Sequence, residues 1–319
     1  MGYRPGMSSD VIVVGGGVIG LTTAIVLAES GRQVRVWCRE RARDSTSAVA
    51  GGLWWPYRIE PEERVGDWAL ASLRVYEELA LKAEETGVRL TEGLHAGARL
   101  DGLGPWAAQV PGLREGPEGL RARLPLIDMP THLDWLERRL IEAGGAVEVR
   151  DVERLPDAPI VVNCTGLGAR HLVPDPQVRP VRGQLVVVEN PGIREWYTAV
   201  EDAGEESTYF MPQPYGLLLG GTAQEDDGNL TPDPATAGRI IAGCARIHPE
   251  IADARVLGHR VGLRPVRDAG VRVERQLASN GWVLVHNYGH GGAGVTVAWG
   301  CAQEAAALAT APSAPCSSR

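Results

Sequence analysis

The sequence contains almost no lysine. Of its 32 lysine and arginine residues, Lys82 alone is a lysine. A P-loop requires a Gly-Lys pair, and a pyridoxal enzyme requires a lysine that forms a Schiff base. No Gly-Lys pair is present, and Lys82 lies in the charged segment 77–85, which has the pattern of a solvent-facing helix. The composition therefore excludes a P-loop and argues against pyridoxal chemistry.

Cysteine, long apolar runs and positive charge are also scarce. The 5 cysteines are widely spaced without a C-x-x-C pair, so we expect neither a disulfide framework nor a zinc knuckle. No run approaches the roughly 18 apolar residues of a membrane span, and residues 1–10 lack a secretory apolar stretch. The net charge of −8 argues against nucleic-acid binding. We expect a cytoplasmic protein that binds neither membranes nor nucleic acid.

Glycine, by contrast, is abundant. The 319 residues include 40 glycines and 1 phenylalanine, which suggests that backbone approaches something closely. Apolar residues make up 44% and charged residues 23%, as in ordinary globular proteins. The length predicts two domains, which can be interleaved.

A strand, a glycine loop and a helix open the chain. Gly15, Gly17 and Gly20 have G-x-G-x-x-G spacing between an apolar strand at 10–14 and a helical pattern at 21–30. A second strand follows, so the unit is βαβ. The glycines permit a tight turn and close approach of a diphosphate, which the helix N-terminus attracts. This pattern predicts a Rossmann-like dinucleotide site.

Two neighbouring residues after the second strand compete for the adenosine ribose. Glu40 has the spacing of a carboxylate that binds a ribose diol, whereas Arg39 would suit a 2′-phosphate. The hydroxyl-rich segment 45–47 and the bare backbone at 51–52 follow closely. They suit the long diphosphate and ribityl chain of FAD better than a nicotinamide dinucleotide.

A second glycine loop precedes a helix of small residues. Gly289, Gly291, Gly292 and Gly294 fall within six positions, more than one tight turn needs. We interpret this loop as bare backbone that lies against a flat ligand face. The helix after it, over 295–309, would present its positive end to an electron-rich flavin edge.

The remaining segments predict a divided α/β protein. Further buried strands are expected at 159–166 and 282–286, and the region 180–223 has the strand-and-turn pattern of a separate antiparallel sheet. The fold class is therefore α/β, with a Rossmann-like FAD-binding domain interleaved with an α+β substrate domain. We assign 1–60, 128–178 and 256–319 to the FAD domain, and 61–127 and 179–255 to the substrate domain.

Several segments together resemble the D-amino-acid oxidase family of flavoproteins. The strongest is Leu284-Val-His-Asn-Tyr-Gly-His-Gly-Gly-Ala-Gly294, and the motif Gly262-Leu-Arg-Pro-Val-Arg267 precedes it. Ala50-Gly-Gly-Leu-Trp54, Asn163-Cys-Thr-Gly166 and Arg182-Gly-Gln184 occur in the family's order. The resemblance covers nearly the whole chain, from about residue 10 to 309.

The resemblance implies noncovalent FAD and the oxidation of D-amino acids to imino acids, which hydrolyse to 2-oxo acids and ammonia. Dioxygen would reoxidise the flavin and yield hydrogen peroxide. Arg264 and Tyr209 match the residues that bind the substrate carboxylate, and the Gly292 carbonyl matches the acceptor of the amine. Pocket-wall positions correspond to Leu53, Trp55, Tyr57 and Met211.

The glycine motifs and the resemblance together predict a set of FAD contacts. They are Gly15, Gly17, Val18, Ile19, Gly20, Arg39, Glu40, Ser45, Thr46, Gly52, Leu53, Val162, Thr165, Gly291, Gly292, Gly294, Val295 and Thr296.

No motif places a general acid or base near the reacting carbon, so we expect no catalytic acid–base residue and a direct hydride transfer from Cα to flavin N5. His286 and His290 are four residues apart but lie in a strand end and a glycine loop, and we predict no metal.

Four alternatives stay open: D-aspartate oxidase, glycine or sarcosine oxidase, a non-catalytic flavoprotein sensor and a nicotinamide dehydrogenase. The first would need a second cationic group in the pocket, and none is evident near Tyr209. The acidic segment 201–208 contains no tyrosine to match a second tyrosine that the family resemblance places in a lid over the substrate. The chain ends in Ser317-Ser-Arg319 rather than the peroxisomal Ser-Lys-Leu, so we expect a bacterial cytoplasmic enzyme. A homodimer is compatible with the sequence.

Overall fold

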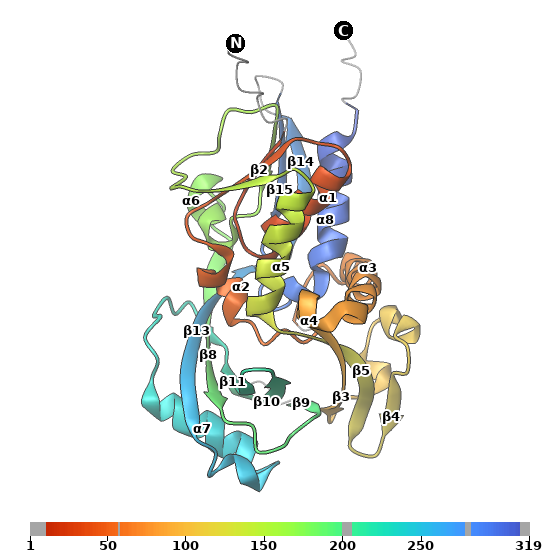
Figure 1. Ribbon diagram of the computed structural model, residues 1–319, viewed down its shortest axis with the longest axis vertical. Helices are drawn as coiled ribbons and strands as arrows, with labels where there is room; N and C mark the ends of the chain where they lie inside the picture. Colours follow the sequence, from red (N-terminus) through yellow and green to blue (C-terminus); the bar gives the residue numbers. More distant parts are fainter. Residues whose placement is uncertain (1–10, 57, 200–205, 278–281, 313–319) are drawn as a thin grey trace.

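The computed structural model describes residues 11–56, 58–199, 206–277 and 282–312, which are arranged around two β-sheets (Figure 1). The first sheet has six strands in the order β14-β15-β7-β1-β2-β6. All neighbouring pairs are parallel except β14 with β15. Its strands are β1 (Val11–Val14), β2 (Val34–Cys38), β6 (Ala146–Val149), β7 (Ile160–Asn163), β14 (Arg272–Leu277) and β15 (Val283–Tyr288).

The central strands of this sheet are apolar on both faces because both faces are covered. Val11 and Val13 join the main core with the helices of the upper half in Figure 1, whereas Ile12 and Val14 belong to a smaller cluster that Leu155 and other loop residues complete. The helices that contribute to the main core are α1 (Val18–Glu29), α3 (Glu62–Leu79), α5 (Met129–Glu142) and α8 (Gly294–Thr310).

The second sheet has nine strands and is mostly antiparallel. Its order is β12-β8-β11-β10-β9-β3-β5-β4, and β13 also pairs with β8. Only the β3–β9 pair is parallel among the pairs of this sheet that the structure describes. Its strands are β3 (Val88–Ala96), β4 (Arg114–Gly116), β5 (Gly119–Ile127), β8 (Val178–Val188), β9 (Trp196–Ala199), β10 (Glu206–Gln213), β11 (Gly216–Thr222), β12 (Gln224–Glu225) and β13 (Val256–Arg267).

Side-chain alternation gives this sheet two different faces. Val186, Phe210 and Leu219 pack under α7 (Pro234–Ala245), which covers the outer face at the bottom of Figure 1. Leu185 and Met211 point the other way and join the main core. The inner face is therefore the one that meets the first sheet's half of the molecule. Short helices complete the chain: α2 (Thr46–Val49), α4 (Ala83–Thr86) and α6 (Ala169–Leu172).

The structure confirms the mixed α/β class and the strands predicted at both ends of the chain. It adds detail in two regions. Helix α3 ends at Leu79, and the short α4 ends at Thr86, where its C-cap Gly87 adopts a left-handed φ of 71°. The strands β3, β5 and β13 were not predicted, because their arginines, glycines and prolines obscure the period of two.

The predicted domain boundary at 256 divides the chain differently from the sheets. It assigns β13 to the FAD domain, whereas β13 pairs with β8 along nearly its whole length in the second sheet. Sheet pairing therefore favours a boundary after β13. Among the helices in the described ranges, none combines the length and the apolar content that crossing a membrane requires.

Helix α8 is held in place by α3. The Tyr76 hydroxyl donates to the Val295 carbonyl at 2.8 Å, and the Gly300 N–H donates to Ser72 Oγ at 3.0 Å. A Cβ at Gly300 would lie 2.3 Å from the Trp68 carbonyl oxygen, so the two helices touch at backbone. Because the second glycine loop leads into α8, this contact also positions that loop.

Gly300→Ala is expected to lower the free energy of unfolding by about 1–3 kcal/mol, since backbone must separate to admit the methyl group. The exposed helix glycine Gly238 has nothing within 4 Å of its Cβ position, so Gly238→Ala should stabilise by about 0.5–1 kcal/mol. Chemical denaturation at saturating FAD measures both. Equal effects of the two variants would contradict the proposed close contact.

Candidate active site

The first glycine loop is packed backbone to backbone. Gly15 has a φ of +117°, and a Cβ there would lie 2.2 Å from the carbonyl oxygen of Cys164. A Cβ at Gly20 would lie 1.8 Å from the carbonyl oxygen of Gly15. Both positions therefore require glycine, and they seat the start of α1 at the carboxyl ends of β1 and β7.

The N-terminus of α1 is open to an anion. Its N-cap residue is Gly17, which has no side chain to cap the helix, and the first turn contains no acidic residue. The Val18 N–H donates to Ser47 Oγ at 3.0 Å, and a Cβ at Gly17 would lie 2.9 Å from that oxygen. Free N–H groups and the helix dipole favour a diphosphate here.

The hydroxyl that reaches this helix belongs to Ser47, not to the two residues predicted individually. Ser45 Oγ donates to the Ala42 carbonyl at 2.6 Å, and Thr46 is exposed. The segment 45–47 was expected to supply donors, but its register against α1 depends on how α2 folds. Sequence alone could not select Ser47.

The two candidate ribose-binding residues, Arg39 and Glu40, follow the end of β2 near the first glycine loop. The Arg39 side chain is 76% exposed and pairs with Glu40 at 3.7 Å. The Glu40 backbone lies beside Gly16, whose Cβ position is 3.7 Å from the Glu40 oxygen. This placement favours Glu40 over Arg39 as the residue nearest the loop, and its role at a ribose stays a prediction.

Residues 51–53 connect the two halves of the site. A Cβ at Gly51 would lie 2.8 Å from Met211 Sδ, and one at Gly52 would lie 2.1 Å from the carbonyl oxygen of Ile127. Leu53 forms an isolated bridge with Leu126 of β5. Met211 of the predicted substrate domain thus lies against the segment that contains Leu53.

The second glycine loop is joined directly to β13. Val266 and His290 form a bridge, and the Gly291 N–H donates to the Pro265 carbonyl at 3.0 Å. Gly289 and Gly291 have φ values of +88° and +54°. Gly292 is exposed, so bare backbone faces the solvent-accessible side of the loop.

His290 is a buried, neutral member of this loop. Burial lowers the pKa of His290 to about 3, and its Nε2 has no hydrogen-bond partner among the described residues. Helix α8 begins four residues later without a side-chain cap and without an acid in its first turn. Positive potential at the start of α8 therefore comes from the helix N-terminus, not from a charged histidine.

Arg264 on β13 and Tyr209 on β10 extend toward one another across the same face of the second sheet. The Arg264 Nη1 group donates to the Thr222 carbonyl at 2.8 Å, and a Cβ at Gly221 would lie 2.8 Å from the Tyr209 hydroxyl. A Cβ at Gly292 would lie 3.3 Å from Arg264 Cδ. Arg264 has no acidic partner within the part of the chain that the structure describes. The guanidinium is thus available to an incoming carboxylate.

Some predicted residues have other roles in the structure. Trp55 is buried between His95 and Trp106, with ring centroids 4.9 and 5.5 Å away. The Thr296 hydroxyl bonds the backbone of Trp55, and Val162 is fully buried in the main core. Any contact of these residues with FAD stays a prediction, and Tyr57 lies outside the described residues.

The remaining predicted contacts line the two loops. Val18 and Ile19 form the first turn of α1, Thr165 follows β7, and Gly294 and Val295 begin α8. The Thr165 hydroxyl is bonded to Asn163 Oδ1 at 2.7 Å, whose own Nδ2 has no partner in the described ranges.

These features fit FAD. The helices α1 and α8, which have no side-chain cap and no acid in the first turn, supply positive ends for a diphosphate and an electron-rich ring, and Gly292 exposes bare backbone just before α8. The orphaned Nε2 of His290 offers one further polar contact in the same region.

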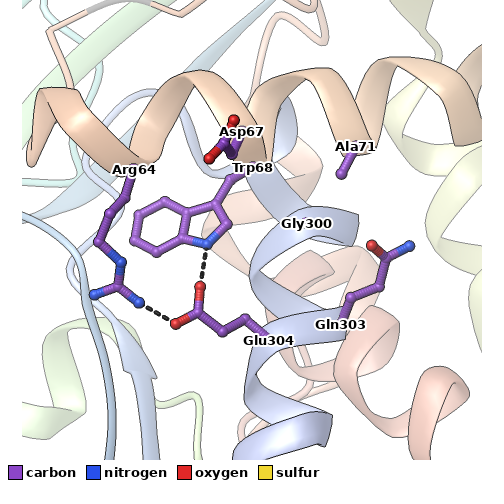
Figure 2. Close-up of a pocket in the computed structure, with 7 residues that line it drawn as sticks. All are labelled: Arg64, Asp67, Trp68, Ala71, Gly300, Gln303 and Glu304. Carbon is purple, nitrogen blue, oxygen red and sulfur yellow. Dashed lines mark hydrogen bonds and ion pairs between the residues drawn. The ribbon is translucent and has the colours of Figure 1, made fainter.

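A separate pocket lies away from these loops. It has a volume of about 340 Å³ and opens between α3 and α8, where Glu304 bonds both Arg64 and the Trp68 indole (Figure 2). The Arg64 guanidinium also stacks over the Trp68 ring at 4.5 Å. Its principal polar groups satisfy one another, and it contains none of the predicted site residues.

No group of three or more histidine, cysteine or acidic residues in the described ranges could hold a metal. His286 Nε2 is instead hydrogen-bonded to Gln276 at 2.8 Å, and burial lowers the pKa of His286 to about 4.

The fold and the site define a flavin-dependent oxidoreductase of the two-sheet type. The family model described as DAO, FAD dependent oxidoreductase, matches residues 10–308, and the chain belongs to this family.

Named relatives support this assignment, and a solved structure shares the fold. A D-amino-acid oxidase from Streptomyces coelicolor is 64% identical over 94% of this chain and 97% of its own length. One from Rubrobacter xylanophilus is 44% identical over 97% and 98%. The crystal structure of glycine oxidase from Geobacillus kaustophilus shares the fold, with a TM-score of 0.78 at 20% identity over 95% of this chain and 94% of that one.

Ser47→Ala is expected to weaken FAD binding about two- to tenfold, because Ser47 Oγ accepts from the Val18 N–H and its own O–H is then left to donate to a phosphate oxygen at the α1 N-terminus. Ser45→Ala serves as the matched control, since Ser45 Oγ bonds within its own turn. Titration of apoprotein with FAD, followed by flavin fluorescence, gives both affinities. If only Ser45→Ala weakens binding, the structural choice of Ser47 is wrong.

Proposed function

We propose that this chain catalyses the FAD-dependent oxidative deamination of D-amino acids. One D-amino acid, dioxygen and water would give a 2-oxo acid, ammonia and hydrogen peroxide. The proposal is supported by the named relative at 64% identity and by one structural observation: an arginine without an acidic partner in the described chain lies against the bare second glycine loop. Bound FAD supplies the two-electron acceptor.

Arg264 and Tyr209 would bind the substrate carboxylate. A planar guanidinium forms two parallel charge-assisted bonds to a carboxylate, and the neighbouring hydroxyl adds a third. The Thr222 carbonyl occupies one donor of Arg264 and orients the remaining ones. The carboxylate thereby fixes one end of the substrate.

The Gly292 carbonyl would accept a hydrogen bond from the substrate amine. With carboxylate and amine fixed, the α-hydrogen of only one enantiomer points at the flavin, and the side chain extends toward the wall that includes Leu53 and Met211. These residues are apolar, which favours neutral over acidic side chains. The protein's contribution is orientation and the exclusion of water, with no protein base in the step.

We infer two units for this function: an FAD unit around the first sheet and a substrate unit around the second, with the boundary after β13. Dioxygen as the oxidant, a homodimer and a cytoplasmic location stay predictions from the sequence.

The decisive experiment is a visible spectrum of purified protein under anaerobic conditions, before and after the addition of D-alanine or L-alanine. The expected result is an oxidised flavin spectrum that D-alanine bleaches and L-alanine does not. Bleaching by L-alanine at a similar rate would overturn the proposed stereochemistry. Absence of flavin absorbance, with NADH formed from NAD, would instead indicate a nicotinamide enzyme.

Arg264→Leu should raise KM for D-alanine by about 100-fold or more, because two charge-assisted bonds of about 1.5–3 kcal/mol each are lost. Arg264→Lys should recover part of the loss, since a point charge replaces the planar fork. Arg123→Leu, at an exposed arginine of β5, is the control and should leave KM unchanged. A wild-type KM for Arg264→Leu would remove Arg264 from the site.

A further inference from the structure

The two carboxylate-binding side chains lie flat on the inner face of the second sheet. Arg264 on β13 pairs with Val181 on β8, and its guanidinium extends across β8 to reach the Thr222 carbonyl on β11. Tyr209 on β10 pairs with Gly220 on β11 and extends in the opposite sense. Their ends meet above β11, at residues 221–222.

Gly183 is the residue that Arg264 crosses. A Cβ at this position would lie 2.6 Å from both Nη1 and Nη2 and 2.7 Å from Cζ of Arg264. The backbone of Gly183 does not adopt a positive φ, so an alanine fits the main chain here. The three atoms nearest to that Cβ position all belong to the Arg264 guanidinium.

Gly220 has the same relation to Tyr209. A Cβ at Gly220 would lie 2.0 Å from Cζ and 2.4 Å from the hydroxyl oxygen of Tyr209. Any side chain at 220 would therefore lift the ring from the sheet. The path from β13 to β10 is bare at the two points where a functional side chain crosses a neighbouring strand.

Gly183 and Gly220 differ from the glycines of the first glycine loop and of segment 51–52. At Gly15, Gly20 and Gly52 a Cβ would meet backbone carbonyl oxygen, so a substitution there must move the main chain. At Gly183 and Gly220 the three nearest atoms all belong to the end of a side chain, Arg264 or Tyr209, that can rotate away. The cost of a methyl group therefore falls on the position of Arg264 or Tyr209, not on the fold.

We propose that Gly183 and Gly220 are positioning residues for substrate-carboxylate binding. By leaving the sheet surface bare, they let Arg264 and Tyr209 lie flat with their polar ends together over β11. This inference rests on the carboxylate-binding role given to these two side chains above. An alanine at either position raises the polar end from the sheet and separates the pair.

The test compares holoenzyme carrying Gly183→Ala with holoenzyme carrying Gly258→Ala. Gly258 lies on β13, and nothing lies within 4 Å of its Cβ position. Gly183→Ala should raise KM for D-alanine at least tenfold and raise the inhibition constant of butanoate, an acid without an amine, in parallel. Its kcat at saturating substrate should fall by less, while its thermal midpoint stays within a few degrees of the control.

A double-mutant cycle with Arg264→Ala shows whether the effect acts through the guanidinium. In that background no side chain crosses position 183, so adding Gly183→Ala should leave KM unchanged. Gly220→Ala, measured alone and with Tyr209→Ala, repeats the test at the second position. A wild-type KM and butanoate constant in Gly183→Ala would overturn the positioning role, as would an undiminished effect in the Arg264→Ala background.

Failure of the positioning role is distinguishable from failure of the proposed function. If Arg264→Ala raises KM but Gly183→Ala does not, the carboxylate assignment stands and the positioning role is wrong. If neither variant changes KM or the butanoate constant, the carboxylate assignment itself is wrong. If Gly183→Ala loses FAD or unfolds at a much lower temperature than the control, the glycine has a structural role and the proposal is also overturned.

Discussion

The arrangement of the site depends on one short stretch of backbone pairing between β13 and the second glycine loop. The Gly291 N–H donates to the Pro265 carbonyl, and Val266 bridges to His290. Arg264 immediately precedes this stretch on β13, and Gly292 follows it on the loop. The pairing therefore determines the separation between the guanidinium proposed to bind substrate and the backbone proposed to face the flavin.

A buried network of hydrogen bonds around Asp175 joins the ends of β13 and β15. Asp175 accepts hydrogen bonds from Arg267 and from the Tyr288 hydroxyl, each at 2.8 Å, and Arg272 donates to that hydroxyl. Arg267 ends β13 and Tyr288 ends β15. A buried carboxylate bonded to one guanidinium and one phenol joins both strand ends, because separating the partners would leave buried charge unsatisfied. The ends of β13 and β15 are thus fixed relative to one another.

Sequence patterns predicted much of this architecture and part of the site. The glycine spacing at 15–20 predicted a strand–loop–helix unit, since only glycine can approach the Cys164 carbonyl so closely. The resemblance identified Arg264 and Tyr209 but could not reveal how they lie on the sheet. Ser47, Gly183 and the Thr222 carbonyl were not predicted as site residues, because their roles depend on register and on main-chain groups that every residue carries. Trp55 packs against Trp106 and His95, and its place in the pocket wall stays a prediction.

The long pairing of β13 with β8 has a mechanical consequence. Strand β13 belongs to the second sheet, and its last residues pair both with β8 and with the second glycine loop. A rotation that separated the two halves would have to break the bonds between the end of β13 and the second glycine loop. Opening of the two halves at this point is therefore disfavoured.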